Sequence, residues 1–193
     1  SIKRYAELFV LVEMDIIDDI FSALQEIPRD MGEEAGQVRP DIAYSILLAN
    51  GNLQDGVALF HSTHNNLGSA ALSIAAIETG TAAMTKQHEQ GRPIQSRPRH
   101  LIVPPDLEFV AKRILNSTET RESASANGTA NPVQSLGLQP VVEPRIDATG
   151  VVDPRTGTSY TGSATNWFMA GSRRTVKICF LRGSNRGPQV RQF

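Results

Sequence analysis

An apolar stripe with helical spacing is the clearest pattern in the first part of the chain. Apolar residues recur three or four apart, at positions 20, 24, 27, 31, 35, 38, 42 and 46. These intervals place them on one face of an α-helix. Pro28 and Pro40 lie inside the stripe, and proline interrupts or bends a helix. The pattern therefore predicts a short helix at about Asp19–Glu26 and a longer one, kinked near Pro40, that ends at Asn50-Gly51.

Six other apolar segments combine branched and aromatic residues over lengths typical of strands. They are 3–12 (KRYAELFVLV), 57–60 (VALF), 100–103 (HLIV), 138–142 (LQPVV), Trp167–Ala170 and Val176–Leu181. Gly171–Arg174 separates the last two segments, which predicts a closing hairpin.

Two further segments favour helices, and the polar segments between elements favour loops. Ser69–Gln87 is rich in alanine, although Gly80 weakens its helical tendency. Residues 107–115 (LEFVAKRIL) are amphipathic and follow two prolines, as at many helix starts. The predicted loops are 91–100, 116–132 and 147–165. Because helices and strands alternate without a regular βαβ order, we predict an α+β fold.

Composition limits the class of protein. The chain has 193 residues, of which 40% are hydrophobic and 20% charged, as in ordinary soluble globular proteins. The single cysteine, Cys179, excludes an internal disulfide, and its apolar surroundings favour a buried side chain over a nucleophile. No apolar stretch approaches the roughly 20 residues that cross a bilayer, and we expect no secretory leader after Ser1.

The net charge of −1 hides a strong asymmetry along the chain. Residues 1–60 carry four basic and eleven acidic side chains, whereas residues 171–193 carry six basic side chains and no acidic one. Such a basic end could bind nucleic acid or meet the acidic surface of a neighbouring copy. Phe180 is the one aromatic residue between those basic residues and the terminal Phe193, which gives little support to a base-stacking platform.

The sequence offers few groups for catalysis or metal binding. His61 and His64 could share one side of a turn, but they lack an HExxH pattern and a third ligand, so a polar loop is preferred. The carboxylates of Asp15, Asp18 and Asp19 fit a helix start better than an acid–base pair. No nucleophile elbow, phosphate loop or dinucleotide-binding turn is present. We therefore predict no enzyme, no catalytic residue, no cofactor and no metal site.

Nine segments, taken in order, carry a resemblance to a known family. They are 14–32 (MDIIDDIFSALQEIPRDMG), 41–51 (DIAYSILLANG), 55–68 (DGVALFHSTHNNLG), 72–87 (LSIAAIETGTAAMTKQ), 99–115 (RHLIVPPDLEFVAKRIL), 131–134 (NPVQ), 141–146 (VVEPRI), 166–170 (NWFMA) and 176–183 (VKICFLRG). In this order they resemble the major head subunit of Mu-like and related tailed phages and prophages, a family with the Hong Kong ninety-seven capsid fold.

The resemblance implies a structural subunit that assembles with copies of itself. Residues 1–60 would form a peripheral domain with a strand and a long spine helix. Residues 61–145 would form an inserted axial domain, and residues 146–193 a closing loop and hairpin that return to the peripheral domain. Pentamers and hexamers of the subunit would build an icosahedral head around DNA, without a membrane or a small-molecule substrate. The subunit would occupy the virion head and, before assembly, the cytoplasm of the bacterial host.

The charge asymmetry supplies candidate contact residues for such a shell. The acidic candidates are Glu33 and Glu34, and the basic candidates are Arg173, Arg174, Arg182 and Arg186. Their opposite charges would serve lateral contacts between subunits or contacts with packaged DNA. Family chains begin with an N-terminal arm and an extended hairpin and continue with a further strand, and we expect these 193 residues to be the core without them.

Two other functions compete with this interpretation. One is a nucleic-acid-binding module that uses the basic C-terminal end. The other is a metal-dependent hydrolase centred on His61 and His64.

Overall fold

The computed structural model describes residues 23–89, 91–120 and 128–171. Its elements are, in chain order, α2 (Ala23–Ala49), η1 (Ser62–His64), α3 (Ile74–Thr85), β1 (His88–Glu89), β2 (Arg92–Pro93), β3 (Pro98–Val103), η2 (Pro105–Leu107), α4 (Glu108–Asn116), β4 (Glu119–Thr120), β5 (Thr129–Ala130), η3 (Gln134–Leu136), β6 (Gln139–Val142), η4 (Pro144–Ile146), β7 (Val151–Val152), β8 (Ser159–Tyr160) and β9 (Phe168–Gly171), where η marks a 3-10 helix. This mixture of helices and strands confirms the predicted α+β class.

The apolar stripe forms one uninterrupted helix, α2, so the predicted division into two helices is wrong. A proline inside a helix removes one backbone donor and crowds the carbonyl four residues earlier. For Pro40 that earlier residue is Gly36, whose backbone has the greatest freedom to adjust. The predicted end of the helix is confirmed, because the helix stops at Ala49 and Asn50 adopts a positive φ of 44°.

A three-stranded sheet in the order β6-β3-β9 joins distant parts of the chain. β3 runs parallel to β6 and antiparallel to β9, so Leu101 lies opposite Pro140 on one side and Met169 on the other. α4 lies between β3 and β6 in sequence and packs against both. The strands predicted at 100–103, 138–142 and 167–170 are therefore confirmed within one or two residues at their ends.

The hydrophobic core surrounds β3. Leu101 and Val103 are fully buried in the middle of the sheet. They pack with Ile77 of α3, with Ala111 and Leu115 of α4, and with Val133 and Leu138 on either side of η3. The helices predicted at 69–87 and 107–115 are confirmed with shorter bounds, and both pack against this sheet.

Several predicted loops contain short strand pairs. Segment 147–165 holds the β7–β8 hairpin, 116–132 holds β4 paired with β5, and 91–100 holds β2 and the start of β3. The backbone hydrogen bonds of these pairs satisfy peptide groups that composition alone assigned to loops. Conversely, the predicted strand at 57–60 is wrong, because Ala58 forms one isolated bridge with Asn52 inside a folded loop.

Some predictions fall outside the described residues. These are the strands at 3–12 and 176–181, the hairpin that would join the latter to 167–170, the acidic residues at 15, 18 and 19, and Cys179.

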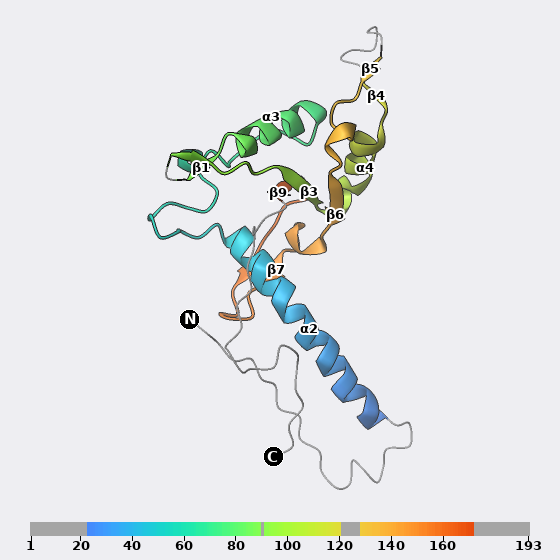
Figure 1. The fold of residues 1–193 in the computed structure, drawn as a ribbon. Coiled ribbons are helices and arrows are strands. Elements are labelled where there is room, and N and C mark those ends of the chain that lie inside the picture. The colour runs from blue at the N-terminus through green and yellow to red at the C-terminus, as the bar shows by residue number, and fades with distance from the viewer. Residues whose placement is uncertain (1–22, 90, 121–127, 172–193) are drawn as a thin grey trace.

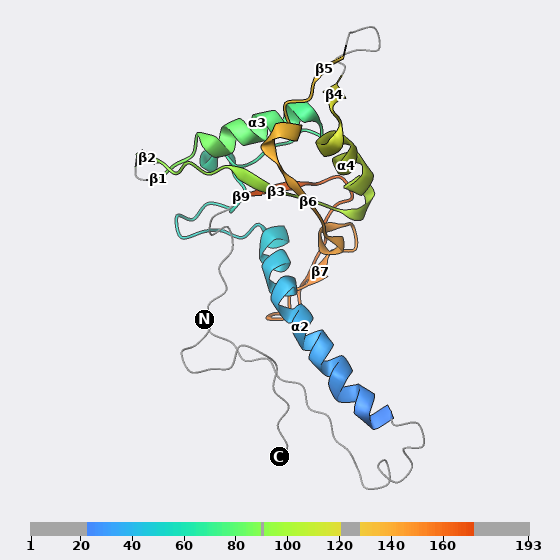
Figure 2. The ribbon, with the colours of Figure 1, turned by 45° about the vertical axis from the view of Figure 1, so that its right-hand side comes forward.

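Figures 1 and 2 show how the described elements are arranged. α2 extends away from the body that holds α3, α4 and the sheet, and the β7–β8 hairpin contacts α2 beside that body. Among the described residues, no helix is both long and apolar enough to cross a membrane.

Candidate functional site

The far end of α2 presents an acidic surface to solvent. Glu26, Asp30, Glu33 and Glu34 are all exposed there. Arg29 pairs with Glu33 at 3.3 Å, but these side chains are 79% and 69% exposed, so the pair contributes little to stability. Figure 1 shows this end of the helix well away from the other labelled elements. Glu33 and Glu34, two of the candidate contact residues, therefore lie where another molecule can reach them.

The guanidinium of Arg145 joins the opposite half of α2 to the segment after β6. Arg145 donates from Nε to Asp41 at 2.5 Å and from Nη2 to Gln37 at 2.6 Å, both on α2. Its Nη1 donates to Glu143 at 2.9 Å. Gln37 and Asp41 are four residues apart and hence on one face of the helix. We call these four residues the Arg145 junction, which fixes α2 against η4.

Tyr44 lies next to the Arg145 junction, and its ionisation reports on that environment. Burial of the phenol, followed by the negative charge of Glu143, raises the pKa of Tyr44 to about 12. Because Glu143 accepts from Arg145, the side chains of Tyr44, Glu143 and Arg145 form one polar cluster where α2 meets η4. The buried hydroxyl of Ser45 donates to the carbonyl of Ile42 at 3.0 Å, so it leaves no unpaired polar group at this interface.

A tightly folded segment, residues 146–163, forms the surface on which α2 lies. Asp153 is almost fully buried and accepts from the guanidinium of Arg155, with Nη2 to Oδ2 at 2.8 Å. This hydrogen bond holds the pKa of Asp153 below its ordinary value. The amide of Ser163 donates to the carbonyl of Ile146 at 2.8 Å and so closes the segment on itself.

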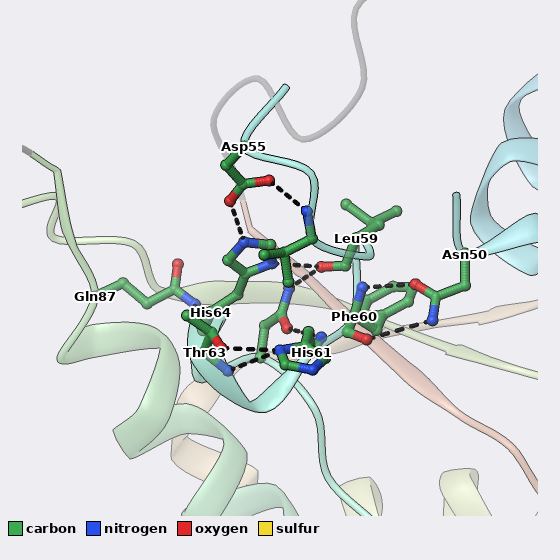
Figure 3. Close-up of polar contacts among 10 residues, drawn as sticks. Asn50, Asp55, Leu59, Phe60, His61, Thr63, His64 and Gln87 are labelled. Atoms are coloured by element: carbon green, nitrogen blue, oxygen red, sulfur yellow. Dashed lines mark hydrogen bonds and ion pairs between the residues drawn. The ribbon is translucent and has the colours of Figure 1, made fainter. Parts of the chain in front are cut away.

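Loop 51–66 makes the second connection between α2 and the body (Figure 3). Asn50 at the helix end exchanges two hydrogen bonds with the backbone of Phe60, at 2.6 and 3.3 Å. The Phe60 ring packs against Phe168 of β9, with 5.4 Å between ring centroids. Asn66 donates to the carbonyl of Leu59 at 2.7 Å. Hydrogen bonds from the side chains of two asparagines thus take the place of the backbone hydrogen bonds that the predicted strand at 57–60 would have made with a neighbouring strand.

His61 and His64 take part in hydrogen bonding within this loop. Nδ1 of His61 accepts from the amide of Thr63 at 3.2 Å. His64 places Nε2 at 2.8 Å from Oδ2 of Asp55 and Nδ1 at 3.2 Å from the carbonyl of Leu59. Among the described residues, no three His, Cys, Asp or Glu side chains lie where they could hold a metal ion. These hydrogen bonds support the polar-loop interpretation of the two histidines. They give no support to a metal-dependent hydrolase.

Some of these positions were predictable from the sequence and others were not. Glu33 and Glu34 lie on one exposed helix end, whereas Arg173, Arg174, Arg182 and Arg186 lie outside the described residues. Arg145 was missed, because its partners on α2 precede it by 104 and 108 residues. In loop 51–66, the sequence predicted a strand at 57–60 and did not show which side chains meet.

Replacing Arg145 with alanine is expected to destabilise the protein by about 2 kcal/mol. The side chain is 23% exposed, which places the loss between that of a surface pair and that of a buried one. The change also leaves the carboxylates of Asp41 and Glu143 without their shared cation. Chemical denaturation followed by circular dichroism measures the difference. Arg29→Ala, which removes an exposed pair on the same helix, is the control and should change stability by less than about 0.5 kcal/mol; equal effects of the two variants would contradict the role assigned to Arg145.

Comparison with known proteins adds to this geometry. A family model described as phage capsid protein matches residues 1–193, the whole chain. Neither the curated proteins nor the solved structures yield a significant match.

Proposed function

This chain belongs to the phage capsid protein family, and from that premise we propose how its surfaces join neighbouring subunits. Membership makes the protein a structural subunit of the virion head that assembles with its own copies into a shell. In such a shell, many modest contacts repeat around closed symmetry axes. Surface complementarity performs the function, and we infer that no residue carries out catalysis.

The proposed contact joins the acidic end of α2 in one subunit to the basic C-terminal end of its neighbour. Glu33 and Glu34 would face Arg173 and Arg174, with Arg182 and Arg186 extending the basic surface or facing packaged DNA. The observation that carries this proposal is the position of Glu33 and Glu34 on a helix end that projects from the body (Figure 2). Complementary charges at such a site guide association and set its register.

The subunit would follow the Hong Kong ninety-seven arrangement, with a peripheral domain at 1–60, an axial domain at 61–145 and a closing segment at 146–193. α2 would be the spine helix of that arrangement. The closing segment meets both of the others, because β9 pairs with β3 and the β7–β8 hairpin contacts α2. Subunits would gather as pentamers and hexamers.

Charge reversal tests this contact. The double variant Glu33→Lys/Glu34→Lys, expressed within its complete reading frame, is expected to form few or no closed shells in negative-stain electron microscopy. Each exposed contact contributes only ~0.5 kcal/mol, but the loss recurs at every equivalent interface. Residual association should weaken less with added salt than that of the wild type, because salt screens exposed charge pairs.

A matched reversal elsewhere and a compensating reversal make the result specific. Glu78→Lys changes an exposed acid on α3 and should leave shell formation intact. Adding Arg173→Glu/Arg174→Glu to the first double variant should restore shells, since the pair is then attractive again. Normal shells from Glu33→Lys/Glu34→Lys alone would overturn the proposed contact.

The nucleic-acid-binding alternative gains no support from the comparisons. The basic residues on which it depends lie outside the described residues. Contact with DNA therefore enters only as part of the shell proposal, where it would be non-specific and strongly salt-dependent.

A further inference from the structure

His64 faces two groups that can only accept hydrogen bonds. Nε2 lies 2.8 Å from a carboxylate oxygen of Asp55, and Nδ1 lies 3.2 Å from the carbonyl oxygen of Leu59. A neutral imidazole carries one N–H, whereas the imidazolium carries two. The doubly protonated ring is therefore the form that satisfies both contacts. A neutral ring leaves one nitrogen lone pair directed at an oxygen.

His61, three residues away, has the opposite requirement. Its Nδ1 accepts from the amide of Thr63 at 3.2 Å, so that nitrogen carries no proton. The two rings meet edge to face at 6.5 Å between centroids. Figure 3 shows the His64 ring directed at Asp55 and the His61 ring directed at Thr63. The two rings thus differ in their surroundings: His64 faces two acceptors, whereas His61 accepts from a backbone donor.

The contacts of His64 hold together two parts of loop 51–66. Asp55 sits in the first turn, where it also accepts from the amide of Val57 at 3.0 Å. Leu59 precedes Phe60, which packs on Phe168 of β9. From the end of α3, the side-chain amide of Gln87 donates to the backbone carbonyl of His64 at 3.4 Å. Loop 51–66 thus contacts the end of α2, the sheet and the segment after α3, and the imidazole of His64 ties two parts of this loop together.

We propose that His64 is a pH-dependent latch: its doubly protonated ring ties Asp55 to Leu59 and holds loop 51–66 on the body, and loss of one proton loosens the loop. The Arg145 junction contains no histidine, so it is unaffected by the same change of pH. The latch thus alters the connection that loop 51–66 makes between α2 and the body and leaves the Arg145 junction intact. It goes beyond the proposed assembly contact and uses none of its residues.

The direction of the pH effect follows from the two groups. The hydrogen bond with Asp55, and then that with Leu59, raises the pKa of His64 above its ordinary value of 6.5. The hydrogen bond from His64, and then that from Val57, lowers the pKa of Asp55 below 3.8. Protonated His64 stabilises the fold fully below pH 6.5, and this stabilisation is lost as pH rises through the raised pKa of His64. Ionised Asp55 stabilises the fold above pH 3.8, and this stabilisation is lost as pH falls through the lowered pKa of Asp55. The latch is therefore closed between these two ordinary values and opens on the alkaline side.

Two-dimensional NMR of the histidine ring protons tests the charged state directly. The four histidines give separate titration curves, and His64→Gln identifies the one that belongs to His64. Its midpoint is expected above 6.5 in the wild type and lower in Asp55→Asn than in the wild type, because the largest cause of the raised pKa is then removed. A wild-type midpoint at or below the ordinary value, or one that Asp55→Asn leaves unchanged, would overturn the proposal.

Amide hydrogen exchange then tests whether protonation holds the loop. After correction for intrinsic rates, protection of the Phe60 amide, which donates to Asn50, is expected to fall several-fold from about pH 5.5 to about pH 8. His64→Gln should show the lower protection at both pH values. His88→Gln, which changes an exposed histidine outside the loop, should behave as the wild type. Protection of Phe60 that does not depend on pH in the wild type would refute the latch, whatever the result of the shell experiments.

Discussion

Gly162→Ala is expected to destabilise the subunit by about 3 kcal/mol or more and to abolish shell formation. A Cβ on Gly162 would lie 2.1 Å from the carbonyl oxygen of Ile146 and 2.4 Å from that of Asp147. Both obstacles are backbone atoms, so no side-chain rotation relieves the clash. The backbone around Gly162 would have to move, which would break the hydrogen bond from Ser163 to Ile146 and expose the fully buried Ile146. Because segment 146–163 supports α2, its displacement would also loosen α2.

The same substitution at Gly32 is the matched control. A Cβ at Gly32 would meet nothing within 4 Å, and the residue lies inside α2. Alanine there should stabilise the protein by about 0.5–1 kcal/mol, because glycine costs more conformational entropy in a helix. Urea denaturation of the two variants and of the wild type measures both effects. If Gly162→Ala unfolds at the wild-type urea concentration, the packing described for segment 146–163 is wrong.

Leu101→Ala is expected to cost about 3 kcal/mol. The side chain is fully buried on the central strand, β3, which lies between β6 and β9. It belongs to the core cluster that also contains residues of α3 and α4. Truncation removes apolar contacts and leaves a cavity that the surrounding sheet cannot fill without moving. Shells should fail to form at temperatures at which the wild type assembles, although no surface residue has changed.

Leu67→Ala is the control, because it makes the same leucine-to-alanine truncation at an exposed position. Leu67 is 62% exposed in the loop before α3, so its truncation should alter stability by less than about 0.5 kcal/mol. Thermal unfolding with two spectroscopic probes measures the difference and tests whether unfolding is two-state. A Leu101→Ala variant as stable as Leu67→Ala would show that β3 is not the centre of the core.

Residues whose structural role depends on their neighbours in sequence were well predicted. The stripe from 20 to 46 predicted the helical residues of α2, and the amphipathic residues 107–115 predicted α4, because a helical period is set within a few turns. Pro28 and Pro40 misled the prediction. The local cost of each proline favoured two separate helices, but the many intact hydrogen bonds of a 27-residue helix outweigh that cost.

Residues whose role depends on distant partners could not be predicted in the same way. Arg145 lies in one of the segments that carry the family resemblance, 141–146, but nothing there indicated its partners, because the helix face it binds is more than 100 residues away. His64 was considered as a metal ligand with His61 and assigned to a polar loop, and its partner Asp55 was not identified. Their mutual contact spans nine residues of irregular loop, for which no periodic pattern exists.

The sequence by itself determined the helices and the three strands of the main sheet, the charge at its two ends and the order of segments that places it among phage capsid proteins. Those properties follow from local spacing and composition, which any conformation of the chain retains. The tertiary structure decided that β3 pairs with β6 and β9, that Arg145 holds α2, and that His64 meets two acceptors at once. Each of these depends on backbone groups and side chains that come together only when the core around β3 has formed, because burial of that core offsets the entropy of closing the loops between them.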